Sequence, residues 1–153
     1  MATVAPLNWS RIAVSGALAG IAGGVIFMLF VYVASLLPEH ASLVSLWQFT
    51  ASTAFGKAAY LSTSYAWAGL GMLLAAAGGW GIGYAYLAHT KPVVNKQPLI
   101  SGFLFGVIVY VVMQFVLFSV QALKVPDAVN VYVDVLATTV FFGIPIAFIA
   151  RVK

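Results

Sequence analysis

Four long apolar runs place the strongest constraint on how this chain can fold. They cover about residues 12–37, 65–88, 99–123 and 128–150, and the first three contain no charged residue. About 20 consecutive apolar residues are needed to cross roughly 30 Å of hydrocarbon, and each run is long enough. Because lipid offers the backbone no hydrogen-bonding partner, each run is expected to be helical. The sequence therefore predicts an all-α fold, a bundle of four transmembrane helices that forms a single membrane domain over residues 1–153.

The composition supports a membrane protein and excludes several classes of function. Of the 153 residues, 63% are hydrophobic and 7% are charged, whereas about 25% of the residues of a soluble domain are charged. The basic residues are scattered and form no stripe, so no nucleic-acid partner is expected. The absence of cysteine excludes disulfides and thiolate-bound metals. The two histidines, His40 and His89, fall on opposite sides of the predicted bilayer, so no metal site is predicted.

Basic residues are distributed unequally between the two sides of the predicted bundle. With four spans, both termini and the loop near residues 89–98 share one side. That side holds more basic residues and no acid: Arg11, Lys91, Lys96, Arg151 and Lys153, against Lys57 and Lys124 on the other side. Because positively charged loops stay in the cytoplasm during insertion, the N- and C-termini are predicted to be cytoplasmic, in a bacterial inner membrane.

Glycine and alanine recur every fourth residue in three of the predicted spans. Small residues at this spacing form one face of a helix and let two backbones approach closely in a membrane. They are therefore predicted to pack helices against one another, with a homo-oligomer interface or a channel lining as the alternatives. The residues concerned are Gly16, Gly20 and Gly24 in the first span, Gly71, Ala75, Gly79 and Gly83 in the second, and Gly102 and Gly106 in the third.

The first and third spans also resemble each other in sequence. The segment from Ser15 to Gly20 aligns with the segment from Ser101 to Gly106 at an offset of 86 residues, with a shared Ser-Gly-x-Leu-x-Gly pattern. The second and fourth spans align poorly. The similarity predicts two tandem helical hairpins in parallel orientation, as in transporters built from repeats.

The longest connection is the predicted outer loop over residues 38–62. If this loop is helical, one face is apolar and the other is polar, with Leu43, Leu46, Trp47 and Ala54 opposite Ser42, Ser45, Gln48 and Ser52. A helix of this kind is expected to lie flat in the membrane interface, with its tryptophan at headgroup depth. It would close the outer end of the bundle as a lid or anchor, or serve as a gate or docking surface.

One ionisable residue lies inside a predicted span. Asp134 is about six residues into the fourth run, at a depth of roughly 9 Å for a rise of 1.5 Å per residue, and Thr138 lies one turn deeper on the same face. In the third run, Gln114 has a comparable depth and shares a face with Tyr110. Adjacent antiparallel helices would bring Gln114 within reach of Asp134. Two interpretations stay open: a hydrogen-bonded residue at a wetted interface, or a site for a proton, a cation or a ligand headgroup, because ionisable groups in a span are costly.

At the level of pattern, the whole chain resembles small bacterial inner-membrane proteins with four spans, such as the YagU-like group. The resemblance implies a four-span fold in the inner membrane, and it transfers no site residues. It is carried by the pairs Gly16 and Gly20, Gly79 and Gly83, and Gly102 and Gly106, and by the exit of the first span at Pro38.

Taken together, these features predict a non-enzymatic membrane subunit that packs against other membrane chains or against itself. Catalysis needs several convergent polar groups in a pocket, and the spans offer few, so no catalytic residue is predicted. No cofactor is predicted either, although a bound lipid or quinone would fit near the outer face. The alternative is a small oligomeric transporter or channel module that uses Asp134, Gln114 and Tyr110.

Overall fold

The computed structural model describes residues 8–36, 42–119 and 131–150. In chain order the elements are α1 (Trp9–Ala34), α2 (Leu43–Phe55), the 3₁₀ helix η1 (Gly56–Tyr60), α3 (Ser64–Thr90), α4 (Pro92–Lys96), α5 (Pro98–Ser119), α6 (Val131–Leu136), the π-helix η2 (Ala137–Gly143) and α7 (Ile144–Ile149). No strand occurs in these described ranges.

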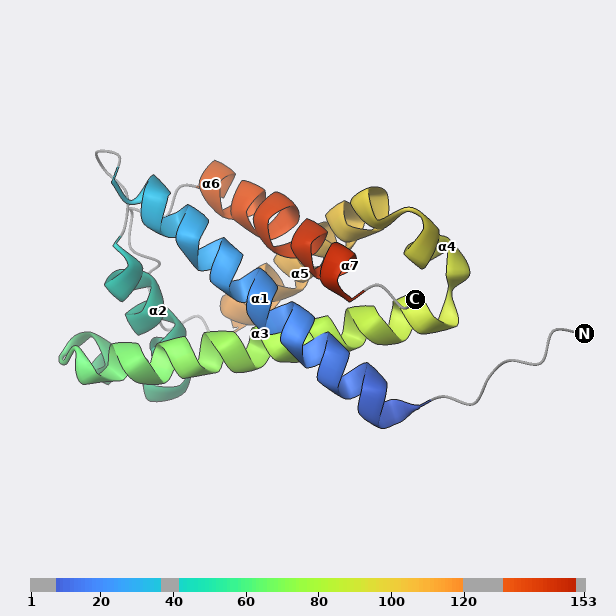
Figure 1. Ribbon diagram of the computed structural model, residues 1–153. Helices are drawn as coiled ribbons and strands as arrows, with labels where there is room; N and C mark the ends of the chain where they lie inside the picture. The colour runs from blue at the N-terminus through green and yellow to red at the C-terminus, as the bar shows by residue number, and fades with distance from the viewer. Residues whose placement is uncertain (1–7, 37–41, 120–130, 151–153) are drawn as a thin grey trace, which may run out of the picture.

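Four helical segments are long and apolar enough to cross a membrane: Trp9–Ala34, Ser64–Thr90, Pro98–Val116 and Tyr132–Ile149. This confirms the predicted all-α fold with four transmembrane helices. The start of α1, the short helix α4 and the end of α7 lie at one end of the molecule, and α2 lies at the other end (Figure 1). Three ends of the predicted spans lie outside the described residues: residue 37 of the first, residues 120–123 of the third and residues 128–130 of the fourth.

Local sequence sets where several of these helices begin. The side chain of Asn8 caps α1 by accepting a hydrogen bond from the Arg11 amide at 3.2 Å, and Ser42 caps α2 in the same way by accepting from the Ser45 amide at 3.2 Å. The first residue of α5 is Pro98. Proline suits this position because the first helical amide has no intrahelical partner.

The fourth span is not a uniform α-helix. The π-helix η2 separates α6 from α7, and Pro145 lies in the first turn of α7. Proline has no amide hydrogen to donate, so a change of helical register just before it accommodates the lost bond. The hydroxyl of Thr138 donates to the carbonyl of Asp134 at 2.9 Å, and that of Thr139 donates to the carbonyl of Val135 at 2.7 Å. These two bonds give backbone carbonyl groups of this segment a side-chain donor.

Helices α1 and α3 form the first hairpin, and their backbones touch at glycine. A Cβ atom placed on Gly16 would lie 2.6 Å from the Cα of Ile82 and 2.8 Å from the carbonyl oxygen of Gly81. A Cβ atom on Gly81 would lie 2.5 Å from the amide nitrogen of Gly20 and would collide with the carbonyl oxygen of Gly16. Only glycine permits this approach at each of these positions.

The second hairpin repeats the same contacts between α5 and the fourth span. A Cβ atom placed on Gly102 would lie 2.9 Å from the Cα of Ile144 and 2.8 Å from the carbonyl oxygen of Gly143. A Cβ atom on Gly143 would lie 2.8 Å from the Cα of Gly106 and would collide with the carbonyl oxygen of Gly102. Each hairpin is therefore held together internally by glycine contacts, and these contacts are equivalent in the two hairpins.

These contacts align all four spans as two repeats. Gly16 and Gly20 correspond to Gly102 and Gly106 at an offset of 86, while Gly81-Ile82 corresponds to Gly143-Ile144 at an offset of 62. The offsets differ because the first hairpin contains the additional segment of α2 and η1. The second and fourth spans, which align poorly by sequence, are thus equivalent in their glycine contacts with the first and third spans.

The two hairpins meet closely on one side and loosely on the other. On the close side, a Cβ atom on Gly23 of α1 would lie 2.8 Å from the Ile146 side chain, and Phe30 stacks on Phe141 with ring centroids 4.1 Å apart. On the other side, α5 meets α3 through the rings of Phe105 and Tyr84, with centroids 5.0 Å apart. Between α3 and α5, large side chains keep the two backbones apart. Between α1 and the fourth span, in contrast, Gly23 lets the helices approach closely.

The glycine face predicted for the second span does not pack against another segment of the described chain. Gly71, Gly79 and Gly83 are exposed, and a Cβ atom on any of them would meet no atom within 4 Å. The α3 glycines that do contact other segments include Gly69 and Gly81, which lie on a different side of the helix. Packing inside the chain therefore uses a different register of small residues from the one predicted. Gly24, in contrast, lies against α3, with a hypothetical Cβ 3.0 Å from that of Ala77.

Helix α2 lies within the predicted outer loop and packs across the first turns of α3. Gly69 admits the α2 backbone at Trp47, whose carbonyl oxygen a side chain on Gly69 would overlap. Ser52, assigned by its spacing to a polar face, is buried, and its hydroxyl donates to the carbonyl of Phe49 at 2.6 Å. The face of α2 that contains Ala51 and Ser52 is thus the packed one. Residues 38–41 of the predicted loop lie outside the described part of the chain.

Candidate functional site

A small polar cluster joins the third and fourth spans. The side-chain amide of Gln114 on α5 donates a hydrogen bond to the carboxylate of Asp134 on α6, with 3.1 Å between Nε2 and Oδ2. Tyr110 lies one turn from Gln114 on the same helix. The matched depths of Gln114 and Asp134 in the sequence anticipate this contact.

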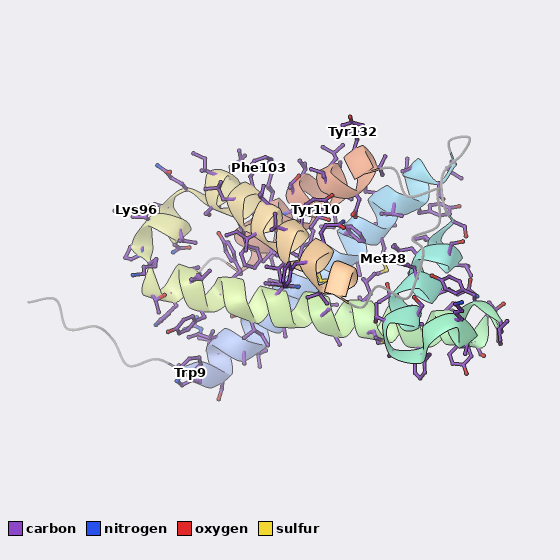
Figure 2. All side chains as sticks on the ribbon, turned by 180° about the vertical axis from the view of Figure 1, so that it is seen from behind. Trp9, Met28, Lys96, Phe103, Tyr110 and Tyr132 are labelled. Carbon is purple, nitrogen blue, oxygen red and sulfur yellow. The ribbon has the colours of Figure 1, made fainter. Side chains whose placement is uncertain are left out.

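The cluster lies near one end of the two helices and is partly covered. Asp134, Gln114 and Tyr110 are half-buried, and Thr138 is buried. The Thr138 hydroxyl bonds the backbone carbonyl of Asp134 at 2.9 Å, so it supports the helix and is not directed at the carboxylate. Figure 2 shows Tyr110 on α5 where that helix faces the fourth span, and Tyr132, 85% exposed, near the start of α6.

The first hairpin serves as an internal control for this cluster. At the offsets that align the glycine contacts, Gln114 corresponds to Met28 and Asp134 to Met72. The first hairpin packs through the same glycine contacts with apolar residues at both positions. The Gln114–Asp134 pair is therefore not needed to hold a hairpin of this kind together, and burying a carboxylate in a span without such a need favours a role in binding.

The chemistry available to the cluster is that of oxygen ligands and one amide. It offers the carboxylate of Asp134, the phenol of Tyr110 and the amide oxygen of Gln114, which suit a proton, a hard cation or a hydrogen-bonding headgroup. In the part of the chain that the structure describes, no three His, Cys, Asp or Glu side chains come together in a way that could hold a metal ion.

A second feature is the outward face of α3, defined by Gly71, Ala75, Gly79 and Gly83. All four residues are exposed, and between Trp67 and Tyr86 no large hydrophobic side chain on α3 is exposed. Helices α1 and α5 differ, because large side chains project from them at every turn, among them Leu18, Ile21, Val25 and Leu29 on α1 and Phe103, Leu104, Ile108 and Val111 on α5. The α3 face thus has glycine and alanine at its exposed positions, where α1 and α5 have large side chains.

The indole of Trp47 marks a third feature, at the end of the molecule where α2 crosses α3. Its ring lies 5.9 Å from that of Trp67, measured between centroids. The indole nitrogen is buried and has no hydrogen-bond partner among the described residues. Buried donors are normally satisfied, and the sequence carries no signal of this one, because a tryptophan at this position also suits a membrane interface.

Comparison of the chain with models of protein families, with curated proteins and with solved structures finds no match. The pattern-level resemblance to the YagU-like group therefore gains no support, and the argument for function depends on the geometry of the chain itself.

Proposed function

We propose that this protein is a non-enzymatic integral membrane subunit that assembles with other membrane chains, or with itself, through the outward face of α3. The observation that carries the proposal is that Gly71, Gly79 and Gly83 are exposed with open space beside each of them. Every other glycine in the four spans meets another segment within 4 Å. In this chain, a glycine in a span otherwise coincides with a helix contact.

The physical cost of these residues supports the same conclusion. Glycine inside a helix is less favourable than alanine by about 1 kcal/mol, and a face without large side chains gives up van der Waals contact with lipid. Both costs are offset where a second helix packs closely, because small faces let backbones approach and gain dispersion contacts in a medium that provides no hydrophobic effect.

The subunit is proposed to sit in a bacterial inner membrane with its termini in the cytoplasm, and a lipid or quinone fits best near Trp47.

Purification in a mild detergent tests the proposal. The protein is expected to elute as a complex with itself or with stoichiometric membrane chains, identified by mass spectrometry of the eluted species. The Gly79→Leu variant is expected to elute as a lone monomer, because a Cβ atom at Gly79 meets nothing within 4 Å in the monomer, while a leucine side chain blocks a close helix contact. A wild-type chain that elutes alone under conditions that preserve known membrane complexes would contradict the assembly role.

A second candidate function follows from the polar cluster. Hydrogen bonding of Gln114 to Asp134 across two spans, in positions that the first hairpin fills with methionine, supports a small oligomeric transporter or channel module. In this alternative, Asp134 binds a proton or a cation, and Gln114 and Tyr110 orient its carboxylate. An oligomer is required because four short helices enclose little space for a pore.

The Asp134→Asn variant tests this alternative. The amide keeps the shape of the side chain and can still bond Gln114, so stability should change by less than about 1 kcal/mol, while any proton or cation flux into reconstituted vesicles should be lost. Flux is measured with a pH-sensitive or a sodium-sensitive dye inside the vesicles. Equal flux through the wild type and Asp134→Asn, or no flux through the wild type, would rule out the transport role of this cluster.

A further inference from the structure

We infer that the end of the molecule formed by the start of α1, the end of α3 and the short helix α4 (Figure 1) binds anionic phospholipids, one on each hairpin. In the first hairpin the phosphate group is held by Arg11, and in the second by Lys96 together with Lys91. The acyl chains lie on the outward faces of α1 and α5. The inference goes beyond the proposed assembly, because no residue of the α3 face takes part in it.

The charge of this end is positive and is not balanced by acids. Arg11, Lys91 and Lys96 are exposed there, and Asp134 is the single acid among the residues that the structure describes. Asp134 lies near the start of the fourth span, about 22 Å from the end of α7 at 1.5 Å per residue, and the end of α7 belongs to the basic end (Figure 1). No described acid can therefore neutralise the three cations, and a ligand with a phosphate group supplies the complementary charge.

Both repeats place a basic residue at the same end of the same apolar strip. At the offset of 86 that aligns α1 with α5, four exposed apolar residues of α1 have exposed apolar counterparts: Val14, Leu18, Val25 and Leu29 correspond to Ile100, Leu104, Val111 and Phe115. Arg11 precedes the α1 strip by three residues and so shares its face of the helix. The counterpart of Arg11 is Gln97, which directly follows Lys96. An exposed apolar strip indicates contact with lipid chains, and the cation at its end in both repeats indicates a negatively charged headgroup.

An aromatic pair places this end at the level of the lipid headgroups. The rings of Trp9 and Tyr86 stack with their centroids 5.5 Å apart and an angle of 10° between their planes, and both side chains are exposed. Tryptophan and tyrosine are enriched where hydrocarbon meets water, because each combines an apolar ring with a polar NH or OH group. Figure 2 shows Trp9 and Lys96 at the same end of the molecule, so the cations lie at the depth of the phosphate groups of a bilayer.

A phospholipid matches both parts of this surface, whereas a soluble phosphate matches only one. Arginine and lysine keep their charge at the interface while their stems cover apolar surface. A lipid can therefore bond its phosphate to Arg11 and lay a chain on Val14 and Leu18. Each Lys or Arg near an anionic membrane surface strengthens binding roughly fivefold, so removal of all three charges is expected to weaken binding about a hundredfold.

Native mass spectrometry of the protein purified in a mild detergent tests the inference, because it counts bound lipids. At a low ratio of lipid to detergent, each wild-type chain is expected to bind two molecules of phosphatidylglycerol, and to bind the zwitterionic phosphatidylcholine at least about tenfold more weakly. Arg11→Gln is expected to retain one of the two lipids, Lys91→Gln/Lys96→Gln the other, and the triple variant neither. Lys57→Gln is the matched control, because Lys57 is an exposed cation on η1, away from the proposed sites, and this variant is expected to retain both lipids.

Three outcomes would overturn the inference. The first is equal binding of the two lipids by the wild type, and the second is an equal loss of phosphatidylglycerol from Lys57→Gln and the triple variant. The third is displacement of phosphatidylglycerol by the same concentration of glycerol phosphate, which would show that a phosphate group is recognised without its chains. The variants are expected to fold, because the replaced side chains are exposed, and circular dichroism checks this. The first and third comparisons use the wild type alone, so they decide the matter even if a variant does not fold.

Discussion

Replacing Gly81 by alanine is expected to destabilise this protein by about 3 kcal/mol, the upper end of the usual range for overpacking a close contact. A Cβ atom at Gly81 would lie 2.6 Å from the Cα of Gly20 and would overlap the carbonyl oxygen of Gly16. The atoms it meets belong to backbone and cannot rotate away, so α1 and α3 must separate. Because this contact joins the two helices of the first hairpin, its loss is expected to destabilise the packing of both α1 and α3.

Gly83→Ala, two residues further along the same helix, is the matched control. Its Cβ atom meets nothing within 4 Å, and alanine favours a helix over glycine by about 1 kcal/mol, so the monomer should be as stable as the wild type or slightly more stable. Unfolding is followed by circular dichroism during titration with a denaturing detergent. Equal midpoints for Gly81→Ala and Gly83→Ala would mean that the first hairpin does not depend on the backbone contact at Gly81.

The four spans could be predicted from the sequence because the cause is simple. A run such as residues 12–37 has no charge and cannot leave its backbone unpaired in lipid, so length and hydropathy decide that it is a helix. Patterns of the same kind do not reveal which elements pack together. The short helix α2 could be anticipated within residues 38–62, but its buried side could not, since Ser52 is polar and is nevertheless covered.

The register of small residues in α3 shows where the sequence is ambiguous. Two ladders of four-residue spacing run along this helix: one contains Gly71, Gly79 and Gly83, and the other contains Ala77, Gly81 and Ala85. Both permit close approach, and glycine carries no side chain that could indicate which side faces the core. The longer run of glycines was the natural prediction, and the structure instead buries the other one.

The polar cluster could be predicted more fully than the glycine register. Asp134 is the single charged residue in the four runs, and antiparallel helices of known rise place Gln114 at the same depth. What the sequence could not supply was the comparison with the first hairpin, because the offset of 62 that equates Asp134 with Met72 emerges only from the contact of Gly143 with Gly106. The role of the cluster stays a prediction.

Tyr84 is expected to give the largest loss of stability of any side chain that joins the two hairpins. It is 2% exposed, its hydroxyl lies 2.7 Å from that of Ser101 at the start of α5, and its ring packs edge-on against Phe105. The second hairpin meets α3 through such side chains, so truncation removes both a filled volume and a link. Tyr84→Ala should cost about 3–5 kcal/mol, as is typical for a large buried ring.

Tyr84→Phe separates the two contributions. It keeps the ring against Phe105 and removes the hydroxyl, so the expected cost is about 1 kcal/mol, and the Ser101 hydroxyl retains its bond to the carbonyl of Val94 at 2.9 Å. The same detergent titration measures both variants. If Tyr84→Phe were as destabilising as Tyr84→Ala, the hydroxyl bond rather than the ring would join the hairpins. The α3–α5 side would then depend on one polar contact, whereas on the α1 side Gly23 packs against Ile146 and Phe30 stacks on Phe141.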